Sequence, residues 1–226
     1  MRKTLLFFFM ICFVALAGYG APCYGPKMPQ SGQWFIGGQT HIIFDRDLES
    51  NWGSLRSTQH FLLLSYGVFD WLSIDLKGGG GNIKQHPVDS DELDYPSSFD
   101  GGYGLRLKLY DQDDLGIVFG FQHISVHPSS IRVEGVKNQA ILDDWQVSLL
   151  VSYSFNKIVP YLGVKASRVD YIHWVDEQRK RRMSDLTESI GGFIGCDLLL
   201  SDRVWINLEG QFFDGQAACA SINFAF

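Results

Sequence analysis

The chain of 226 residues lacks three features that would point to common classes of protein. After residue 20 it has no apolar stretch long enough to cross a membrane as a helix, which needs about 20 such residues. It has no excess of positive charge, since its net charge is −6, and this argues against a nucleic-acid-binding protein. It is also poor in cysteine: only Cys23, Cys196 and Cys219 follow residue 20, and an odd number does not indicate a disulfide framework.

The first 20 residues have the layout of a secretory signal peptide. Arg2 and Lys3 form a positive start, an apolar run follows, and small residues occupy positions 18–20. The apolar run is shorter than a spanning helix requires. The sequence therefore predicts a signal peptide over 1–20 and one all-β domain over 21–226.

The remainder of the chain alternates between apolar and polar residues. Period-2 alternation predicts β-strands, and one apolar face on each strand predicts an apolar environment on that side. In RVWINLEGQFF, for example, Val204, Ile206 and Leu208 alternate with Trp205, Asn207 and Glu209.

Ten strands are expected, and tight turns alternate with long polar loops between them. Short turns at one rim and long loops at the other are typical of an outer-membrane barrel. We therefore predict an all-β, antiparallel, up-and-down transmembrane β-barrel of about ten strands, with eight or twelve as alternatives. Cys196 and Cys219 then lie two strands apart, about 9–10 Å, which is beyond disulfide reach. The expected strands are 33–45, 57–68, 71–78, 99–110, 115–127, 142–155, 158–173, 187–200, 203–213 and 216–226, and the long loops are 46–56, 79–98, 128–141 and 174–186.

The last strand has aromatic residues at its end. Phe224 and Phe226, with apolar residues at alternate positions before them, resemble the C-terminal signal of bacterial outer-membrane proteins. The resemblance implies insertion by the barrel assembly machinery and a location in the cell outer membrane. Aromatic residues near both ends of the strands predict girdles at the two lipid interfaces.

Charges of both signs fall at positions that face the interior. In a narrow barrel such charges are expected to pair across the lumen and close it. The alternative is a narrow, selective pore. The predicted lumen charges are Asp75, Lys77, Arg106, Lys108, Lys165, Asp197 and Glu209.

Three strings in the predicted loops resemble binding motifs. GGGGN at 78–82 lacks the lysine and hydroxyl residue of a phosphate-binding loop, and we expect a flexible strand exit. DSDELD at 89–94 lacks the glycine and distal glutamate of an EF-hand, so we predict a solvated acidic loop. No cofactor or metal site is predicted. The basic run Arg179, Lys180, Arg181 and Arg182 is a candidate contact for lipopolysaccharide phosphates, with a solvated charge run as the alternative.

A final pattern joins histidine and serine on one strand face. His123, Ser125 and His127 share the outward parity of Phe119 and Phe121. A serine nucleophile needs a base within hydrogen-bond reach and an acid that orients the base. Asp143 on the next strand, or Glu134 in the loop, are the candidate acids.

The H-x-S string formed by His123 and Ser125 looks like the catalytic motif of outer-membrane lipid A 3-O-deacylases, small barrels with a lipid-facing Ser-His-Glu triad. The resemblance implies Ser125 as nucleophile and His123 as base. Two features depart from the family pattern: Val126 replaces the asparagine after the serine, and Asp143 lies further along the chain than the family glutamate.

Three functions are compatible with these patterns. The first is a small, non-enzymatic outer-membrane barrel with a closed interior and surface loops, with a structural or adhesive role. The second is a lipid A acyl esterase acting in the outer leaflet, and the third is a narrow pore. The expected partners are outer-membrane lipid, lipopolysaccharide and the assembly machinery.

Overall fold

A computed structural model of the chain describes residues 23–49, 52–184 and 188–226, which form one antiparallel sheet of twelve strands. The predicted signal peptide lies outside the described residues. No helix among the described residues is long and apolar enough to cross a membrane. The strands are β1 (Trp34–Asp47), β2 (Ser54–Phe69), β3 (Leu72–His86), β4 (Leu93–Gln112), β5 (Leu115–Val126), β6 (Ile131–Val133), β7 (Val136–Tyr153), β8 (Ile158–Val175), β9 (Gln178–Met183), β10 (Ile190–Leu199), β11 (Val204–Phe212) and β12 (Gln216–Ala225).

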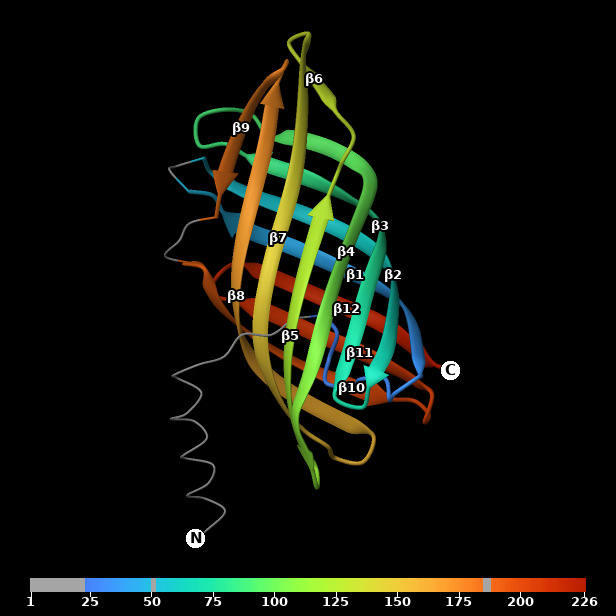
Figure 1. The fold of residues 1–226 in the computed structure, drawn as a ribbon. Coiled ribbons are helices and arrows are strands. Elements are labelled where there is room, and N and C mark those ends of the chain that lie inside the picture. Colours follow the sequence, from blue (N-terminus) through green and yellow to red (C-terminus); the bar gives the residue numbers. More distant parts are fainter. Residues whose placement is uncertain (1–22, 50–51, 185–187) are drawn as a thin grey trace.

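Ten of these strands close into a barrel (Figure 1). The first strand, β1, pairs with the last, β12, and β7 pairs directly with β8. The remaining two, β6 and β9, extend β7 and β8 as hairpins at one end of the barrel. The predicted antiparallel barrel of ten strands is therefore confirmed. We call the end with the tight turns the periplasmic end and the opposite end the outer end, following the orientation of outer-membrane barrels.

Several predicted loops are wrong, because the strands run much further than the alternation showed. β3 continues to His86 and β4 begins at Leu93, so most of segment 79–98 is strand. Glycine has no side chain and hides alternation, which is why the run 78–81 looked like a strand exit. The basic run 179–182 likewise lies in β9 rather than in a loop.

The wall of the barrel is uneven in height. β4, β7 and β8 contain 20, 18 and 18 residues, whereas β10, β11 and β12 contain only 10, 9 and 10. Figure 1 shows the long strands rising past the short ones at the outer end. The tall side of the wall therefore carries an extra surface that the low side does not have.

The outside of the barrel is apolar over its lower part. Leu62 is 60% exposed, Leu162 58% and Ile194 59%, and all three point away from the lumen. Buried residues alternate with more exposed ones along β2 and β11. Such a surface is stable when lipid surrounds it, as the apolar band of a transmembrane barrel requires.

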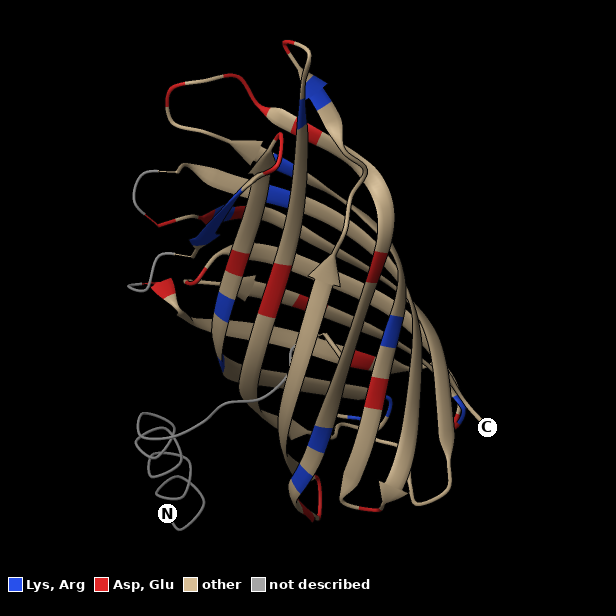
Figure 2. Cartoon of the chain, turned by 45° about the horizontal axis from the view of Figure 1, so that its top comes forward, with Lys and Arg blue, Asp and Glu red and all other residues tan. Residues whose placement is uncertain are grey.

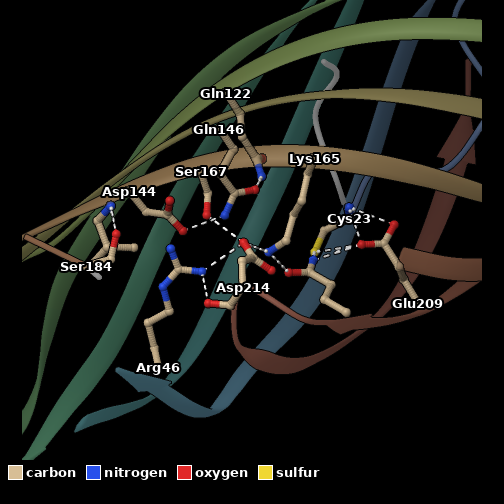
Figure 3. Close-up of polar contacts among 12 residues, drawn as sticks. Cys23, Arg46, Gln122, Asp144, Gln146, Lys165, Ser167, Ser184, Glu209 and Asp214 are labelled. Atoms are coloured by element: carbon tan, nitrogen blue, oxygen red, sulfur yellow. Dashed lines mark hydrogen bonds and ion pairs between the residues drawn. The ribbon is translucent and has the colours of Figure 1, made fainter. Parts of the chain in front are cut away.

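Buried charged side chains, some of them in ion pairs, fill the interior at mid-height, and we call them the middle layer. Figure 2 marks the charged positions along the strands, and Figure 3 shows part of the middle layer. Arg106 donates to the two carboxylate oxygens of Asp75 at 2.9 and 2.8 Å. Asp214, from the turn between β11 and β12, lies 2.8 Å from Arg46 Nη1 and 3.0 Å from Lys165 Nζ. The middle layer consists of Arg46, Asp75, Lys77, Arg106, Asp144, Lys165, Asp197, Glu209 and Asp214, all buried.

Lys108 is the one predicted lumen charge that lies elsewhere. The register of β4 against β5 shifts between Lys108 and Tyr110, which is a β-bulge. Lys108 precedes this bulge and keeps the inward parity of Arg106, so it lines the periplasmic end of the lumen beside Lys27 and Met28. Lys108 instead pairs with Asp111 at 2.7 Å near the periplasmic turn, where the aspartate is exposed.

Above the middle layer, toward the outer end, the interior becomes apolar. Tyr171 and Leu142 are fully buried here, and Tyr171 donates its hydroxyl proton to Gln85 at 2.8 Å. We call this cluster the upper layer. It consists of Leu55, Ile83, Tyr95, Ile124, Val126, Ala140, Leu142, Val169 and Tyr171.

Candidate functional site

The outer face of the tall wall carries two neighbouring rows of polar and aromatic residues. The rows cross β4, β5, β7 and β8 and are two residues apart along each strand, so both face away from the lumen. The first row is Gly101, Ser125, Asp143 and Asp170, and the second is Tyr103, His123, Trp145 and Arg168.

Ser125 is the centre of the first row. Its Oγ lies 2.8 Å from His127 Nε2 and 2.5 Å from Asp143 Oδ1. A hydroxyl group has one proton and two acceptor lone pairs, so it can donate to only one of these neighbours at a time. When Oγ donates to the carboxylate, His127 donates to Oγ. When the hydroxyl rotates, it donates to an unprotonated His127 Nε2, which is the arrangement a general base requires.

The histidine at hydrogen-bond distance from Ser125 is thus His127 rather than His123. The His123 ring stacks on Trp145 with 3.9 Å between centroids, and it lies 5.4 Å from the Tyr103 ring. Its Nε2 is 3.6 Å from Asp143 Oδ1 and has no hydrogen-bond partner among the described residues. Both histidines therefore lie close to this pair: His127 contacts Ser125, whereas His123 lies near Asp143 and stacks on Trp145.

His127 is held in place from inside the barrel. It follows the last residue of β5, and its backbone N–H is shared between the carbonyl oxygen of Phe99, at 3.1 Å, and the carboxylate of Asp100, at 3.2 Å. Asp100 is fully buried. Period-2 parity placed His127 on the correct face, but only the end of β5 and these contacts direct its ring to Ser125.

A cluster of positive charge borders the first row. Asp170 pairs with Arg168, whose Nε lies 3.3 Å away, and with Arg181 of β9. Both arginine side chains remain about half exposed, at 52% and 51%. The other arginines of the basic run stack on aromatic rings: Arg179 on Trp174 and Arg182 on Trp52. Of the four predicted contact residues, Arg181 is therefore the one joined to the serine row.

The second candidate acid is remote from this cluster. Glu134 has a positive φ of 50° and lies in the turn of the β6–β7 hairpin, at the outer tip.

Within the described ranges, no group of three or more His, Cys, Asp or Glu side chains is arranged to hold a metal ion.

The site lies where the polarity of the wall changes. Ile124 and Val126, which alternate with His123 and Ser125 on β5, point into the apolar upper layer. Two residues lower, Gln122 points into the lumen and hydrogen-bonds Lys77 at 3.0 Å. The site is therefore at the boundary between the lipid-facing band and the part of the wall above it, among aromatic residues typical of a membrane interface.

No protein-family model and no curated protein sequence matches the chain. Its fold is similar to that of an outer-membrane channel from Pseudomonas putida F1, with a TM-score of 0.52, 9% identity, and 91% of this chain and 99% of the other covered. The translocator domain of autotransporter NalP from Neisseria meningitidis matches with a TM-score of 0.47, 8% identity and coverage of 99% and 95%. Ail of Yersinia pestis matches with a TM-score of 0.43, 9% identity and coverage of 87% and 100%.

The chain is thus a small outer-membrane β-barrel. The similarity to the channel supports the fold, and the apolar band on the outside of the wall supports a location in the membrane.

Proposed function

We propose that the protein is an outer-membrane serine esterase that removes an acyl chain from lipid A at the outer lipid interface. The observation that carries the proposal is the 2.8 Å contact between Ser125 Oγ and His127 Nε2 on the outer face of the wall. The resemblance of the H-x-S string to lipid A deacylases supports the same substrate class.

The proposed reaction has two steps. Ser125 Oγ attacks the ester carbonyl carbon while His127 Nε2 takes the hydroxyl proton, because an unassisted serine is a weak nucleophile. Collapse of the tetrahedral intermediate releases the sugar alcohol, which receives that proton from His127. A water molecule then attacks the acyl-serine in the same way, and the fatty acid leaves.

Neighbouring residues support these steps. Asp143 and His127 both contact Ser125 Oγ, so the Asp143 carboxylate would lie close enough to offset the positive charge that develops on His127. Arg168 and Arg181 offer two half-exposed guanidinium groups, which bind phosphate in a bidentate manner. A phosphorylated lipid headgroup would then have its phosphate at the arginines and its acyl chains against the apolar wall below.

The test is acyl release by the purified, folded barrel. It is mixed with lipopolysaccharide in detergent micelles, and with phospholipid in a parallel reaction, and products are followed by mass spectrometry. We expect loss of one acyl chain from lipid A. Ser125→Ala and His127→Ala should each lower the rate by roughly 10³-fold or more. His123→Ala should have a smaller effect, because its ring is stacked on Trp145.

The matched control is Ser129→Ala, an exposed serine in the segment after β5. It should retain the native rate, and all variants should keep the heat-modifiable mobility of a folded barrel. Unchanged lipid A in the presence of the native protein would refute the proposed esterase activity. Release of fatty acid from phospholipid but not from lipid A would mean that the substrate is a phospholipid.

A second candidate function is a closed structural or adhesive barrel, which the filled interior favours. Arg46 of β1, Asp214 of the β11–β12 turn and Lys165 of β8 form a buried ion-pair cluster inside the lumen (Figure 3). On this basis the protein should show no steady conductance in planar bilayers. Stable, ion-selective channels would instead support a pore. If the protein neither changes lipid A nor conducts ions, the structural or adhesive function is the one that remains.

A further inference from the structure

The N-terminal segment enters the lumen and is held there by the strands around it. The Tyr24 ring lies between two cations, with Lys77 Nζ at 4.2 Å and the Arg106 guanidinium carbon at 5.0 Å from its centroid. Arg106 also donates to the carbonyl oxygen of Lys27 at 2.8 Å. Met28 packs in a cluster with Val118, Leu150, Tyr161 and Phe193. Residues 24–28 therefore act as a plug of the barrel.

Cys23, immediately before this plug, is fully buried and surrounded by polar contacts (Figure 3). Its backbone N–H lies 3.0 Å from each carboxylate oxygen of Glu209, and Gln211 Nε2 donates to its Sγ at 3.0 Å. On the other side, Gln39 donates to its carbonyl oxygen at 2.5 Å. Cys23 has a positive φ of 69°, which a residue with a side chain adopts only where its surroundings enforce it.

These contacts place Cys23 over β12. Gln39 belongs to β1 and Glu209 to β11, the two strands that flank β12. Cys219 of β12 is the register partner of Glu209 on one side, and on the other side it pairs with His41, two residues along β1 from Gln39. Cys219 is also buried, and Glu209, its register partner on β11, is the residue whose carboxylate accepts from the Cys23 backbone N–H.

We infer that Cys23 and Cys219 form a disulfide that ties the N-terminal plug to the inner wall of the barrel. The bond forms between the two Sγ atoms as each thiol loses its proton and the pair loses two electrons. The electrons pass by thiol–disulfide exchange to a disulfide of a thiol oxidase of the cell envelope, which is reduced to a dithiol. An outer-membrane protein assembles through this oxidising compartment, where disulfides persist.

The third cysteine explains the odd count. Cys196 is on β10, where it lies opposite Leu208 of β11, and Leu208 lies opposite Ala220 of β12. Cys196 is thus two strands away from Cys219, as expected, and it stays reduced in this scheme. One disulfide inside the lumen and one free thiol on the wall account for all three cysteines.

The test is a thiol assay of the native protein. Cells are lysed directly into denaturant that contains a maleimide, so that buried free thiols are also blocked, and the protein is then digested without reduction and examined by mass spectrometry. We expect a linked pair of peptides containing Cys23 and Cys219, and alkylated Cys196. Reduction before alkylation should label all three. On non-reducing gels the boiled protein should migrate faster than the reduced protein, because the bond closes a loop over nearly the whole barrel.

Single variants test the pairing itself. Cys219→Ser should make Cys23 available for alkylation, Cys23→Ser should do the same for Cys219, and Cys196→Ser should leave the linked peptides unchanged. Alkylated Cys23 and Cys219 in the unreduced native protein would overturn the inference, and so would a lipid attached to Cys23. The native-protein assay requires no variant to fold, so the inference remains testable in every case.

Discussion

The middle and upper layers of the lumen belong to the same barrel, yet they contain opposite kinds of side chain. In β7, Asp144 and Gln146 point into the middle layer, whereas Ala140 and Leu142, only a few residues away, point into the upper layer. The parity of the strand is the same throughout. What changes is the environment on the other side of the wall.

Beside the middle layer the outer face of the wall is covered by lipid, so the apolar residues point outward and the polar ones are left to fill the interior. Beside the upper layer the outer face carries polar groups such as Arg56, Asp94 and Arg168, and the interior is apolar as in a soluble protein. The direction of amphipathicity therefore inverts along a single strand. The serine site lies at the level of this inversion.

The largest expected effect comes from breaking the charge balance of the middle layer. Asp214→Asn removes the carboxylate that Arg46 and Lys165 share, and it leaves two buried cations without their partner. Removal of one partner from a buried ion pair costs about 3–5 kcal/mol. We expect a decrease of that size in the free energy of unfolding, measured by urea titration in lipid vesicles.

Asp111→Asn is the matched control, because that carboxylate pairs with Lys108 at the exposed periplasmic rim. It should change the unfolding free energy by no more than about 1 kcal/mol. Equal effects of the two substitutions would mean that the middle layer is hydrated and that its ion pairs are not buried.

The next effect concerns the packing of the upper layer. Leu142→Ala leaves a cavity among side chains that are fully buried, and such changes cost about 2–5 kcal/mol. Leu162→Ala, on the lipid-facing side of β8, should cost less because lipid chains fill the space that the side chain leaves. The same urea titration compares them. If Leu162→Ala is the more costly change, the upper layer is not a packed core.

A smaller effect is expected at the glycine run in β3, where the two layers meet. A Cβ atom at Gly79 would overlap the carbonyl oxygen of His60 on β2, whereas one at Gly78 would meet nothing within 4 Å. Overpacking of this kind costs about 1–3 kcal/mol. Gly79→Ala should therefore destabilise the barrel and Gly78→Ala should not, as judged by the temperature at which the folded gel band is lost. Equal melting temperatures would show that β3 is free to shift.

The smallest effect is a pH dependence at the outer end. Burial, and then the charge of Lys180, lowers the pKa of His173, whose Nε2 lies 2.9 Å from Asn138 Oδ1. The unfolded chain then binds a proton more readily than the folded one, so the unfolding free energy falls as the pH drops below about 6.5. His173→Gln should make this decline less steep and leave stability at pH 8 nearly unchanged. If the unfolding free energy falls equally steeply between pH 7 and 5 in the native protein and the variant, His173 is not the source of the pH dependence.

Much of the fold follows from local alternation alone. Side chains on a strand have a period of two, so Val204, Ile206 and Leu208 identify one face without knowledge of any neighbour. Tight turns at one end and long connections at the other then predict a barrel and its strand number. The same parity places Ser125, His123 and Asp143 on the outer face and Asp75, Arg106 and Glu209 inside.

Other features depend on the register between strands, and alternation carries no information about register. The glycine run in β3 has no side chains to alternate, so the continuation of the strand was hidden. The bulge after Lys108 and the inward turn at Asp214 are likewise set by partners distant in sequence. Strand ends and loops therefore required the tertiary structure.

The site and the cysteine pair show the same division. Sequence alone determined which residues share a face, because the tetrahedral geometry of Cα makes successive side chains on a strand alternate. Tertiary structure decided which of them touch: Asp100 accepts from the backbone N–H of His127, and the His127 ring, rather than that of His123, contacts Ser125. It also placed Cys23 against Glu209 and Gln39, on the two strands that flank β12 and its Cys219. Such contacts depend on how a closed barrel aligns its strands in height, and that alignment is a property of all the strands together.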